Sequence, residues 1–484
     1  MSSGTVPTIA TTSRAHARNV VAIASLCMFV GGLNMSIVNI ALSTISHEID
    51  ASAAQSSWIL LANMLASNAL MVSFGRLGDL ASRRNLFTAG VVVFGLGSVL
   101  SAIATNGGVL IAGRAVSGVG SAMMFSTTSA IIARAVPRAR IGQAMGIYYA
   151  CNSAAQLLGP VIGGVMVDTI GWPWMFWINI PFCVLMLVGA LRFLPRDAAG
   201  HGKDFDMLGS TLVIAIATTF VAMLTQIASR GFDVPYIVVS CACLAVLVPL
   251  LIWREARARL PLIDMSLFRD RLFLGTSFTT MLTHLVRFAI LILVALIYQS
   301  AYGMSATMAG FLVLPIAVGT LVASPLAGTI EMRKGSAWVS TAGAAIGVVA
   351  VLFCASMIWW HEAWVLVAIG GALAGAAGGM VQTANASAIT KATPPERLGV
   401  VGSLRVMIQG TGIVAGTAVA LASVTILLPQ EGKSAVYAIA NAMIPEEFRE
   451  GLLDGVPIAF GVLLIASLGA VWLSRASYRG YEEE

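Results

Sequence analysis

The sequence predicts an all-α integral membrane protein of fourteen transmembrane helices, built as two six-helix halves with an inserted helix pair. Of its 484 residues, 58% are hydrophobic and only 10% are charged, whereas soluble domains carry roughly 25% charged residues. The hydrophobic residues gather into fourteen runs, each close to the roughly 20 apolar residues that cross a bilayer. Basic residues are concentrated in alternate connections between these runs.

The fourteen runs are evenly distributed along the chain. Their centres lie near residues 33, 66, 96, 120, 153, 184, 218, 244, 285, 317, 348, 374, 414 and 464. The first run extends from about residue 20 to 45 and follows a basic tail. It is too long for the apolar core of a signal peptide, so we expect it to remain as the first span.

The distribution of Lys and Arg predicts the orientation. Alternate connections hold clusters such as Arg76/Arg83/Arg84 and Arg134/Arg138/Arg140, whereas those between them carry only Arg230, Lys433 and Arg449. Basic loops face the cytoplasm. We therefore expect both termini in the cytoplasm, which requires an even number of spans.

A faint internal repeat predicts the two halves. The stretches 75–84 and 328–335 end the second and the tenth span, and each reads Gly-x-aliphatic before a basic cluster. Repeated halves are common in secondary transporters. The predicted parts are the cytoplasmic tail 1–19, the first half 20–200, the inserted pair 201–260, the second half 261–474 and the cytoplasmic tail 475–484.

Small residues in the fifth span predict close helix contacts. Ala155, Gly159 and Gly163 are spaced four apart, and Gly146 lies further back. Such spacing lets two helix backbones approach each other. Pro160 follows Gly159 directly and is expected to kink the helix.

Charged residues inside the predicted spans are few, and they are basic. Arg114, Arg287 and Arg405 lie at membrane depth, while no Asp or Glu falls at the middle of a span. Buried arginines face a protein interior or a water-filled cavity, and they stay protonated near neutral pH. We expect Arg114 to face a cavity or to hydrogen-bond Asn34; Arg405 could instead reach the membrane interface.

His284 is the candidate proton carrier. It precedes Arg287 by three residues, so the two share a helix face, and histidine titrates near physiological pH. The alternative is a structural histidine that hydrogen-bonds a neighbouring helix. Acids at the ends of spans, namely Asp79, Asp168 and Glu331, are the other candidates for proton coupling.

Amide side chains complete the predicted substrate site. Asn34, Asn152, Gln156, Gln382 and Asn385 lie within spans, the last four in two pairs spaced for one helix face. We expect them to line a cavity with Arg114, His284 and Arg287, although amides also join packed helices.

Several motifs resemble the major facilitator superfamily. Gly75, Leu77, Asp79, Arg83 and Arg84 match its loop signature between the second and third spans. Arg114 with Gly118 and Gly120 resembles its fourth-span motif, and the stretch 146–164 resembles the antiporter motif of drug exporters. The stretches 172–181, 205–209 and 261–268 resemble the fourteen-span drug:proton antiporter family in particular.

This resemblance implies proton-driven efflux of toxic organic compounds across a bacterial inner membrane. It also implies a gate that involves Gly75, Asp79, Arg83 and Arg84, with Gly146, Gly159, Pro160 and Gly163 on the antiporter helix. One departure weakens the implied antiport: the family's first span usually carries an aspartate where this chain has Asn34.

We therefore predict a secondary transporter that exports small organic molecules by alternating access, with proton antiport as the expected coupling. The alternative is a transporter or facilitator of organic anions or neutral solutes with weak or no coupling. A non-transporting membrane sensor or scaffold is a third possibility. No nucleophile–base pair, metal cluster or P-loop is recognisable, so we expect no enzyme, cofactor, metal or nucleic-acid partner. The expected partners are the substrate, protons and the lipid bilayer, and the expected oligomeric state is a monomer.

Overall fold

The chain is described by a computed structural model that covers residues 14–195, 206–230, 233–258, 262–304, 306–360, 364–429, 432–433, 436 and 446–479. Every regular element in these ranges is a helix. The outer parts of the predicted tails, residues 1–13 and 480–484, lie outside the described residues. The described chain begins inside α1 (Arg14–Glu48), so the end of the predicted N-terminal tail is already helical.

The α-helices of the described residues follow one another along the chain. They are α2 (Ala53–Leu80), α3 (Arg83–Ala102), α4 (Gly107–Ala135), α5 (Ile141–Thr169), α6 (Trp174–Trp177), α7 (Asn179–Phe193), α8 (Met207–Arg230), α9 (Val234–Arg257), α10 (Arg271–Leu296), α11 (Ala306–Ala355), α12 (Trp364–Ala392), α13 (Leu398–Val424) and α15 (Glu446–Ser477). Short helical turns include η1 (Arg138–Arg140), η2 (Met265–Arg269), η3 (Ile297–Ala301), η4 (Ser356–Ile358) and η5 (Pro395–Arg397).

The described residues contain fourteen crossings, as predicted. Thirteen helical segments of the described chain are long and apolar enough to span a membrane. One of them, α11, has 50 residues and contains a non-helical residue, Gly335 with φ 78° and ψ 162°, which divides it into two crossings. Each predicted centre falls within one crossing. An apolar segment in lipid must satisfy its backbone hydrogen bonds internally, so each apolar run of this length forms a helix.

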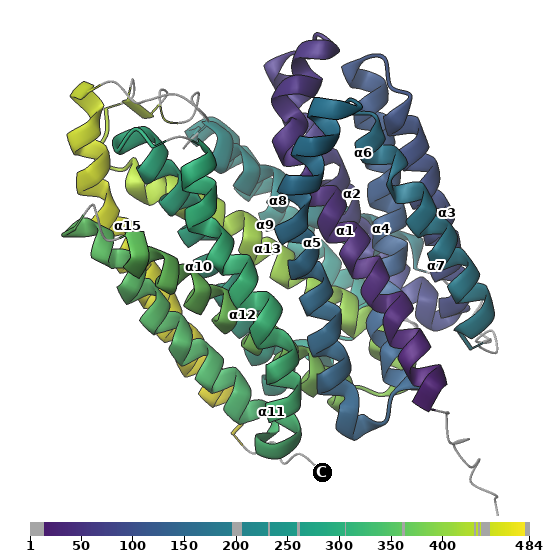
Figure 1. Cartoon of the computed structure of the whole chain (residues 1–484). Coiled ribbons are helices and arrows are strands. Elements are labelled where there is room, and N and C mark those ends of the chain that lie inside the picture. The colour runs from purple at the N-terminus through teal and green to yellow at the C-terminus, as the bar shows by residue number, and fades with distance from the viewer. Residues whose placement is uncertain are drawn as a thin grey trace, which may run out of the picture.

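The helices form two groups (Figure 1). Helices α1 to α7 lie together, and helices α10 to α15 form the second group. Helix α8 packs against α9 and contacts both α2 and α13, so the inserted pair lies where the two groups meet. This arrangement confirms two halves with an inserted pair. The exact part boundaries stay a proposal, and the boundary at residue 201 lies outside the described residues.

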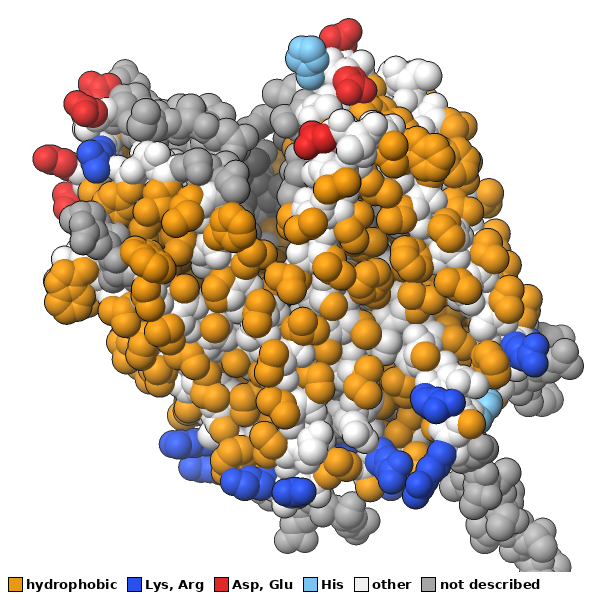
Figure 2. Space-filling model, in the orientation of Figure 1, with side chains coloured by type: hydrophobic (Ala, Val, Ile, Leu, Met, Phe, Trp, Pro, Cys, Tyr) orange, Lys and Arg blue, Asp and Glu red, His pale blue; other side chains and the backbone are white. Residues whose placement is uncertain are grey.

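Each group has its own apolar core. In the second group Ile290, Leu293 and Phe460 pack in one cluster, and in the first Phe87, Phe94 and Met124 pack in another. On the face shown in Figure 2, apolar side chains form a broad band, with most of the Lys and Arg side chains at one end and the Asp and Glu side chains at the other. The protein is therefore a multi-pass membrane protein. We call its two ends the basic end and the acidic end.

Candidate functional site

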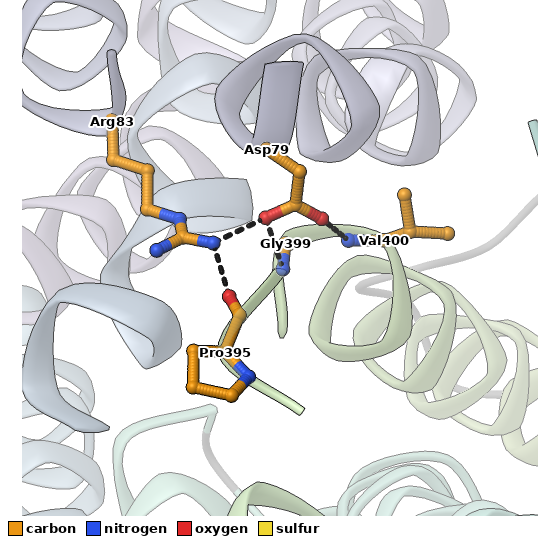
Figure 3. A network of polar contacts seen from close by, with 5 residues as sticks. All are labelled: Asp79, Arg83, Pro395, Gly399 and Val400. Atoms are coloured by element: carbon orange, nitrogen blue, oxygen red, sulfur yellow. Dashed lines mark hydrogen bonds and ion pairs between the residues drawn. The ribbon is translucent and has the colours of Figure 1, made fainter. Parts of the chain in front are cut away.

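A polar network joins the two halves at the basic end (Figure 3). Asp79, near the end of α2, accepts hydrogen bonds from the backbone N–H groups of Gly399 and Val400, each at 3.0 Å. Those two residues open α13. Arg83 forms a 2.7 Å ion pair with Asp79 and also donates to the carbonyl oxygen of Pro395. A carboxylate at a helix N-terminus satisfies free N–H groups and complements the helix dipole.

Local sequence explains how Asp79 reaches α13. Helix α2 ends at Leu80, and Ser82 accepts from Asn85 N–H as the N-cap of α3. Gly75 lies one turn before Asp79, where a Cβ would overlap Ser403 Oγ and the backbone of Gly399. Only glycine lets the two helices approach this closely. The last residue of the loop signature, Arg84, instead donates to the Leu191 carbonyl within the first half.

A second contact between the halves involves α5 and α11. Glu331 is buried and pairs with Lys391 Nζ at 2.7 Å, while Ser336 Oγ donates to the same carboxylate oxygen at 2.6 Å. Its other oxygen faces the start of α5, where a Cβ on Gly142 would overlap it. Gly146 meets the backbone of Ser324 in the same way. The basic end is thus closed by α2 against α13 and by α5 against α11.

Arg405 lies at this junction rather than at the membrane interface. Its side chain is buried, and its guanidinium donates to Tyr149 Oη on α5 at 2.7 Å. The interfacial interpretation of Arg405 is therefore wrong. Arg405 is the eighth residue of α13, about two helical turns from its start, and its long side chain reaches across to α5.

Arg114 is buried within the first half and bonded to neutral groups. Its Nε donates to the Ile59 carbonyl at 3.1 Å, and its Nη1 donates to Asn34 Oδ1. Asn63 donates in turn to the Arg114 carbonyl at 3.3 Å. No carboxylate pairs with Arg114 among the described residues, and Asn34 Nδ2 is buried there without a partner. The expected bond to Asn34 is present, and the positive charge stays uncompensated.

His284 and Arg287 are both buried in the second half. His284 Nδ1 lies 2.9 Å from the Thr280 carbonyl, and the Gln382 side chain also hydrogen-bonds the imidazole. Arg287 donates to Thr320 Oγ1 at 3.2 Å, and its guanidinium lies 4.9 Å from the ring centre of Phe288. A small cavity between α10, α11, α12 and α15 borders Arg287. The structure therefore brings together His284, Arg287 and Gln382.

The other predicted amides are engaged inside their own halves. Gln156 donates to Asn152 Oδ1 at 2.5 Å, and Asn152 reaches the Met28 carbonyl of α1 at 3.4 Å. Asn385 has its bonds met by Thr276, Thr280 and Tyr478, at 2.9 to 3.0 Å. These contacts favour a packing role for Asn385, whereas Asn152 and Gln156 remain half-buried.

Four further predicted residues lie away from the contacts between the halves. Asp168 is exposed near the end of α5 at the acidic end. Gly159 and Gly163 face Ser36 and Ile37 of α1, within the first half. Pro160 lies inside α5. Of the antiporter-motif residues, Gly146 is the one that meets the other half directly.

Several contact residues had no signal in the sequence. Tyr149, Pro395 and Lys391 are ordinary in type and position, and only the packing of the helices shows their partners. Gly399 and Val400 contribute backbone N–H groups, which no side-chain motif can mark.

Fourteen crossings in two halves, joined at one end by a capped helix N-terminus and buried hydrogen bonds, are typical of a multi-pass transporter rather than an enzyme. The family model described as Major Facilitator Superfamily matches residues 24–417 and, in a second match, 276–473. The chain belongs to this superfamily.

Curated relatives of similar length include transporters and resistance proteins. The riboflavin transporter RibZ of Clostridioides difficile is 28% identical over 81% of this chain and 84% of that protein. The multidrug resistance protein Stp of Mycobacterium tuberculosis is 27% identical over 81% of this chain and 73% of that protein. The methyl viologen resistance protein SmvA of Salmonella typhimurium is 29% identical over 80% of this chain and 78% of that protein.

Solved structures share the fold. The proton:xylose symporter XylE matches with a TM-score of 0.64 and 12% identity over 94% of this chain and 95% of that chain. The human organic anion transporter MFSD10 matches with a TM-score of 0.59 and 16% identity over 95% and 99%. At these identities the likeness concerns the fold alone.

Proposed function

We propose that the protein is a secondary active transporter that exports small organic molecules from a bacterial cytoplasm by proton-coupled alternating access. The observation that carries this proposal is the interlock at the basic end, where Asp79 caps α13 across the two halves. From the positive-inside rule we expect that end, and with it both termini, on the cytoplasmic side of the inner membrane. The two groups of helices diverge towards the acidic end (Figure 1), which fits a state closed to the cytoplasm.

Export, as opposed to uptake, is favoured by the relatives. Stp and SmvA are named as resistance proteins, and resistance by a transporter requires removal of the toxic compound. RibZ is named as a riboflavin transporter. Riboflavin and methyl viologen are therefore suitable first probes, since one is uncharged and the other a permanent dication.

His284 is our first candidate for proton coupling. It is buried beside Gln382 and one turn from Arg287, and histidine is the side chain that most readily exchanges a proton near neutral pH. The buried end-of-span acids Asp79 and Glu331 are the second candidates. Asp168 is a weaker candidate because it lies exposed at the acidic end.

The test is substrate-driven proton movement in proteoliposomes that enclose a pH-sensitive dye. An outward substrate gradient should change the luminal pH, and His284→Ala should abolish that change while substrate still binds. His47→Ala is the matched control, since His47 is exposed in the last turn of α1. Unchanged proton movement in His284→Ala would exclude His284. If proton movement is also unchanged in Asp79→Asn and Glu331→Gln, antiport through these groups is excluded. Substrate flux with no proton movement in the wild-type protein would exclude it as well.

A second candidate function rests on Arg114. Its guanidinium is bonded to Asn34 and Ile59, with no acidic partner among the described residues. An uncompensated buried cation favours an anionic or neutral polar substrate and disfavours a permanent cation. Under this alternative the protein transports organic anions or neutral solutes, with weak or no coupling.

Asn34→Asp distinguishes the two functions. The new carboxylate would neutralise Arg114, so transport of methyl viologen relative to riboflavin should rise about tenfold or more, the effect of about 1.4 kcal/mol. Asn34→Ala, which removes the amide and adds no charge, is the control and should not raise the ratio. A wild-type protein that already exports methyl viologen well, without needing Arg114, would contradict the anion or neutral-solute alternative.

A further inference from the structure

Two buried carboxylates that belong to neither the candidate substrate site nor the contacts between the halves meet at the base of the inserted helix pair. Asp206 lies directly before α8, and Glu255 lies in the last turn of α9. Glu255 is 3% exposed, and the Asp206 side chain is 6% exposed. The two residues are distant in sequence, and the antiparallel packing of α8 and α9 brings them together at the basic end.

Each carboxylate uses one oxygen and leaves the other without a partner. Asp206 Oδ1 accepts from Gly209 N–H at 2.8 Å and pairs with Arg254 at 3.2 Å. Glu255 Oε2 accepts from Ile263 N–H at 3.2 Å. Asp206 Oδ2 and Glu255 Oε1 are both buried with no partner among the described residues.

The two free oxygens face the same small volume. A Cβ placed on Gly209 would lie 2.5 Å from Glu255 Oε1 and 2.9 Å from Asp206 Oδ2. Among the described residues, the charged groups that act on Glu255 are Asp206 and Arg254. Arg254 already pairs with Asp206 and is partly exposed. In the part of the chain that the structure describes, one guanidinium therefore faces two buried carboxylates, and Ile263 contributes only a backbone N–H.

We propose that Asp206 and Glu255 hold one proton between them, which makes the base of the inserted pair a proton-binding site. Two adjacent carboxylates in a dry site cannot both stay ionised, and they titrate as a pair. A shared proton supplies the missing donor to the free oxygens. A metal cation fits less well, because calcium and magnesium need about six or more oxygen ligands and two free oxygens are present here.

The site links three parts of the molecule. Glu255 belongs to α9, Asp206 leads into α8, and Ile263 belongs to the segment that leads into η2 and α10 of the second half. Loss of the proton places two buried negative charges against each other. The inserted pair should then pack less tightly against the second half. The strength of this packing should therefore depend on the pH of the solution at the basic end. This inference does not depend on substrate, direction or coupling.

The test is thermal unfolding of the purified full-length protein between about pH 5 and pH 9. Free carboxyls are ionised throughout most of this range, so the folded pair binds one proton more than the unfolded chain. Stability should therefore fall as pH rises. Glu255→Gln should remove that fall, because its amide N–H₂ donates to Asp206 as the proton did and its carbonyl still accepts from Ile263. Glu396→Gln, at an exposed acid of η5, should keep the wild-type pH profile.

Infrared spectroscopy gives a second readout that does not depend on unfolding. The carbonyl stretch of one protonated carboxylic acid at neutral pH should disappear in Glu255→Gln and also in Asp206→Asn. Asp206→Asn serves in addition if Glu255→Gln folds poorly. The proposal is overturned if neither variant loses such a band, or if neither variant changes the pH profile. It is also overturned if sodium raises the unfolding temperature at fixed pH while potassium does not.

Discussion

At the scale of single residues, the closed state depends on positions where only a glycine fits. A Cβ on Gly75 would overlap Ser403 Oγ and the backbone of Gly399. The neighbour is partly backbone and cannot move aside cheaply. Gly75 is thus as much a part of the interlock as Asp79, whose carboxylate reaches α13 only because the helices are this close.

Gly75→Ala should therefore weaken the closed basic end. Overpacking of this kind costs about 1–3 kcal/mol, and separation of α2 from α13 relieves it. We expect a lower unfolding temperature and faster thiol labelling of a cysteine introduced at Ser403. Gly164→Ala is the control, because no atom lies within 4 Å of a Cβ there. Equal labelling rates in the two variants would contradict a closed contact at Gly75.

Asp79→Asn tests the charge rather than the space. The amide keeps the shape of the carboxylate but offers one acceptor oxygen, so it cannot accept from Gly399 and Val400 and also pair with Arg83. Loss of a buried charge-assisted contact costs about 1–3 kcal/mol. The rate of thiol labelling of a cysteine introduced at Ser403 should rise by about tenfold or more. Asp168→Asn, at an exposed acid of α5, should leave this rate unchanged.

At the scale of elements, α11 needs a glycine to make two crossings from one continuous helical run. Gly335 has φ 78° and ψ 162°, a region that is essentially restricted to glycine. Directly beside it, Ser336 donates to Glu331, which is paired with Lys391. The turn at Gly335 therefore also positions the acid that faces α5.

Gly335→Ala should strain this turn by about 1–3 kcal/mol. We expect a lower unfolding temperature and weaker closure between α5 and α11. Gly310→Ala, in the same helical run with nothing within 4 Å of its Cβ, is the matched control. If both variants unfold at the same temperature, the conformation at Gly335 is not the constraint described here.

The sequence predicted the elements well, because hydropathy and span length act locally. All fourteen predicted centres fall in crossings. Gly335, which divides α11, is the last residue of the stretch 328–335, identified in the sequence as a repeat of 75–84. Contacts between elements were harder to predict from the sequence. Nothing in the sequence pairs Arg405 with Tyr149, or Asp206 with Glu255, because each pair forms only when helices distant in the chain come together.

At the scale of the whole molecule, the contacts place the charges in two roles. Asp79, Arg83, Glu331 and Arg405 lie where the halves meet at the basic end. Arg114, in the first half, and His284 and Arg287, in the second, are buried among neutral partners. The resemblance to drug exporters predicted Asp79 as a gate residue, but its partners on α13 had to come from the structure. The sequence already showed Asn34 at the position where the family usually has an aspartate. The structure adds that Asn34 accepts a hydrogen bond from Arg114.

The central claim is that the two halves must separate at the basic end during transport. A Cβ on Gly402 of α13 would lie 3.6 Å from the Cβ of Ser129 on α4, within the spacing of a disulfide. Ser129→Cys/Gly402→Cys joins the halves. Gly95→Cys with native Cys183, at 3.8 Å between α3 and α7, joins two helices of one half as the control.

The decisive measurement is substrate flux through both variants under oxidising and then reducing conditions. We predict that oxidation stops transport in Ser129→Cys/Gly402→Cys, that reduction restores it, and that the Gly95→Cys control transports in both conditions. Undiminished flux through a fully cross-linked Ser129→Cys/Gly402→Cys protein would contradict alternating access through this end.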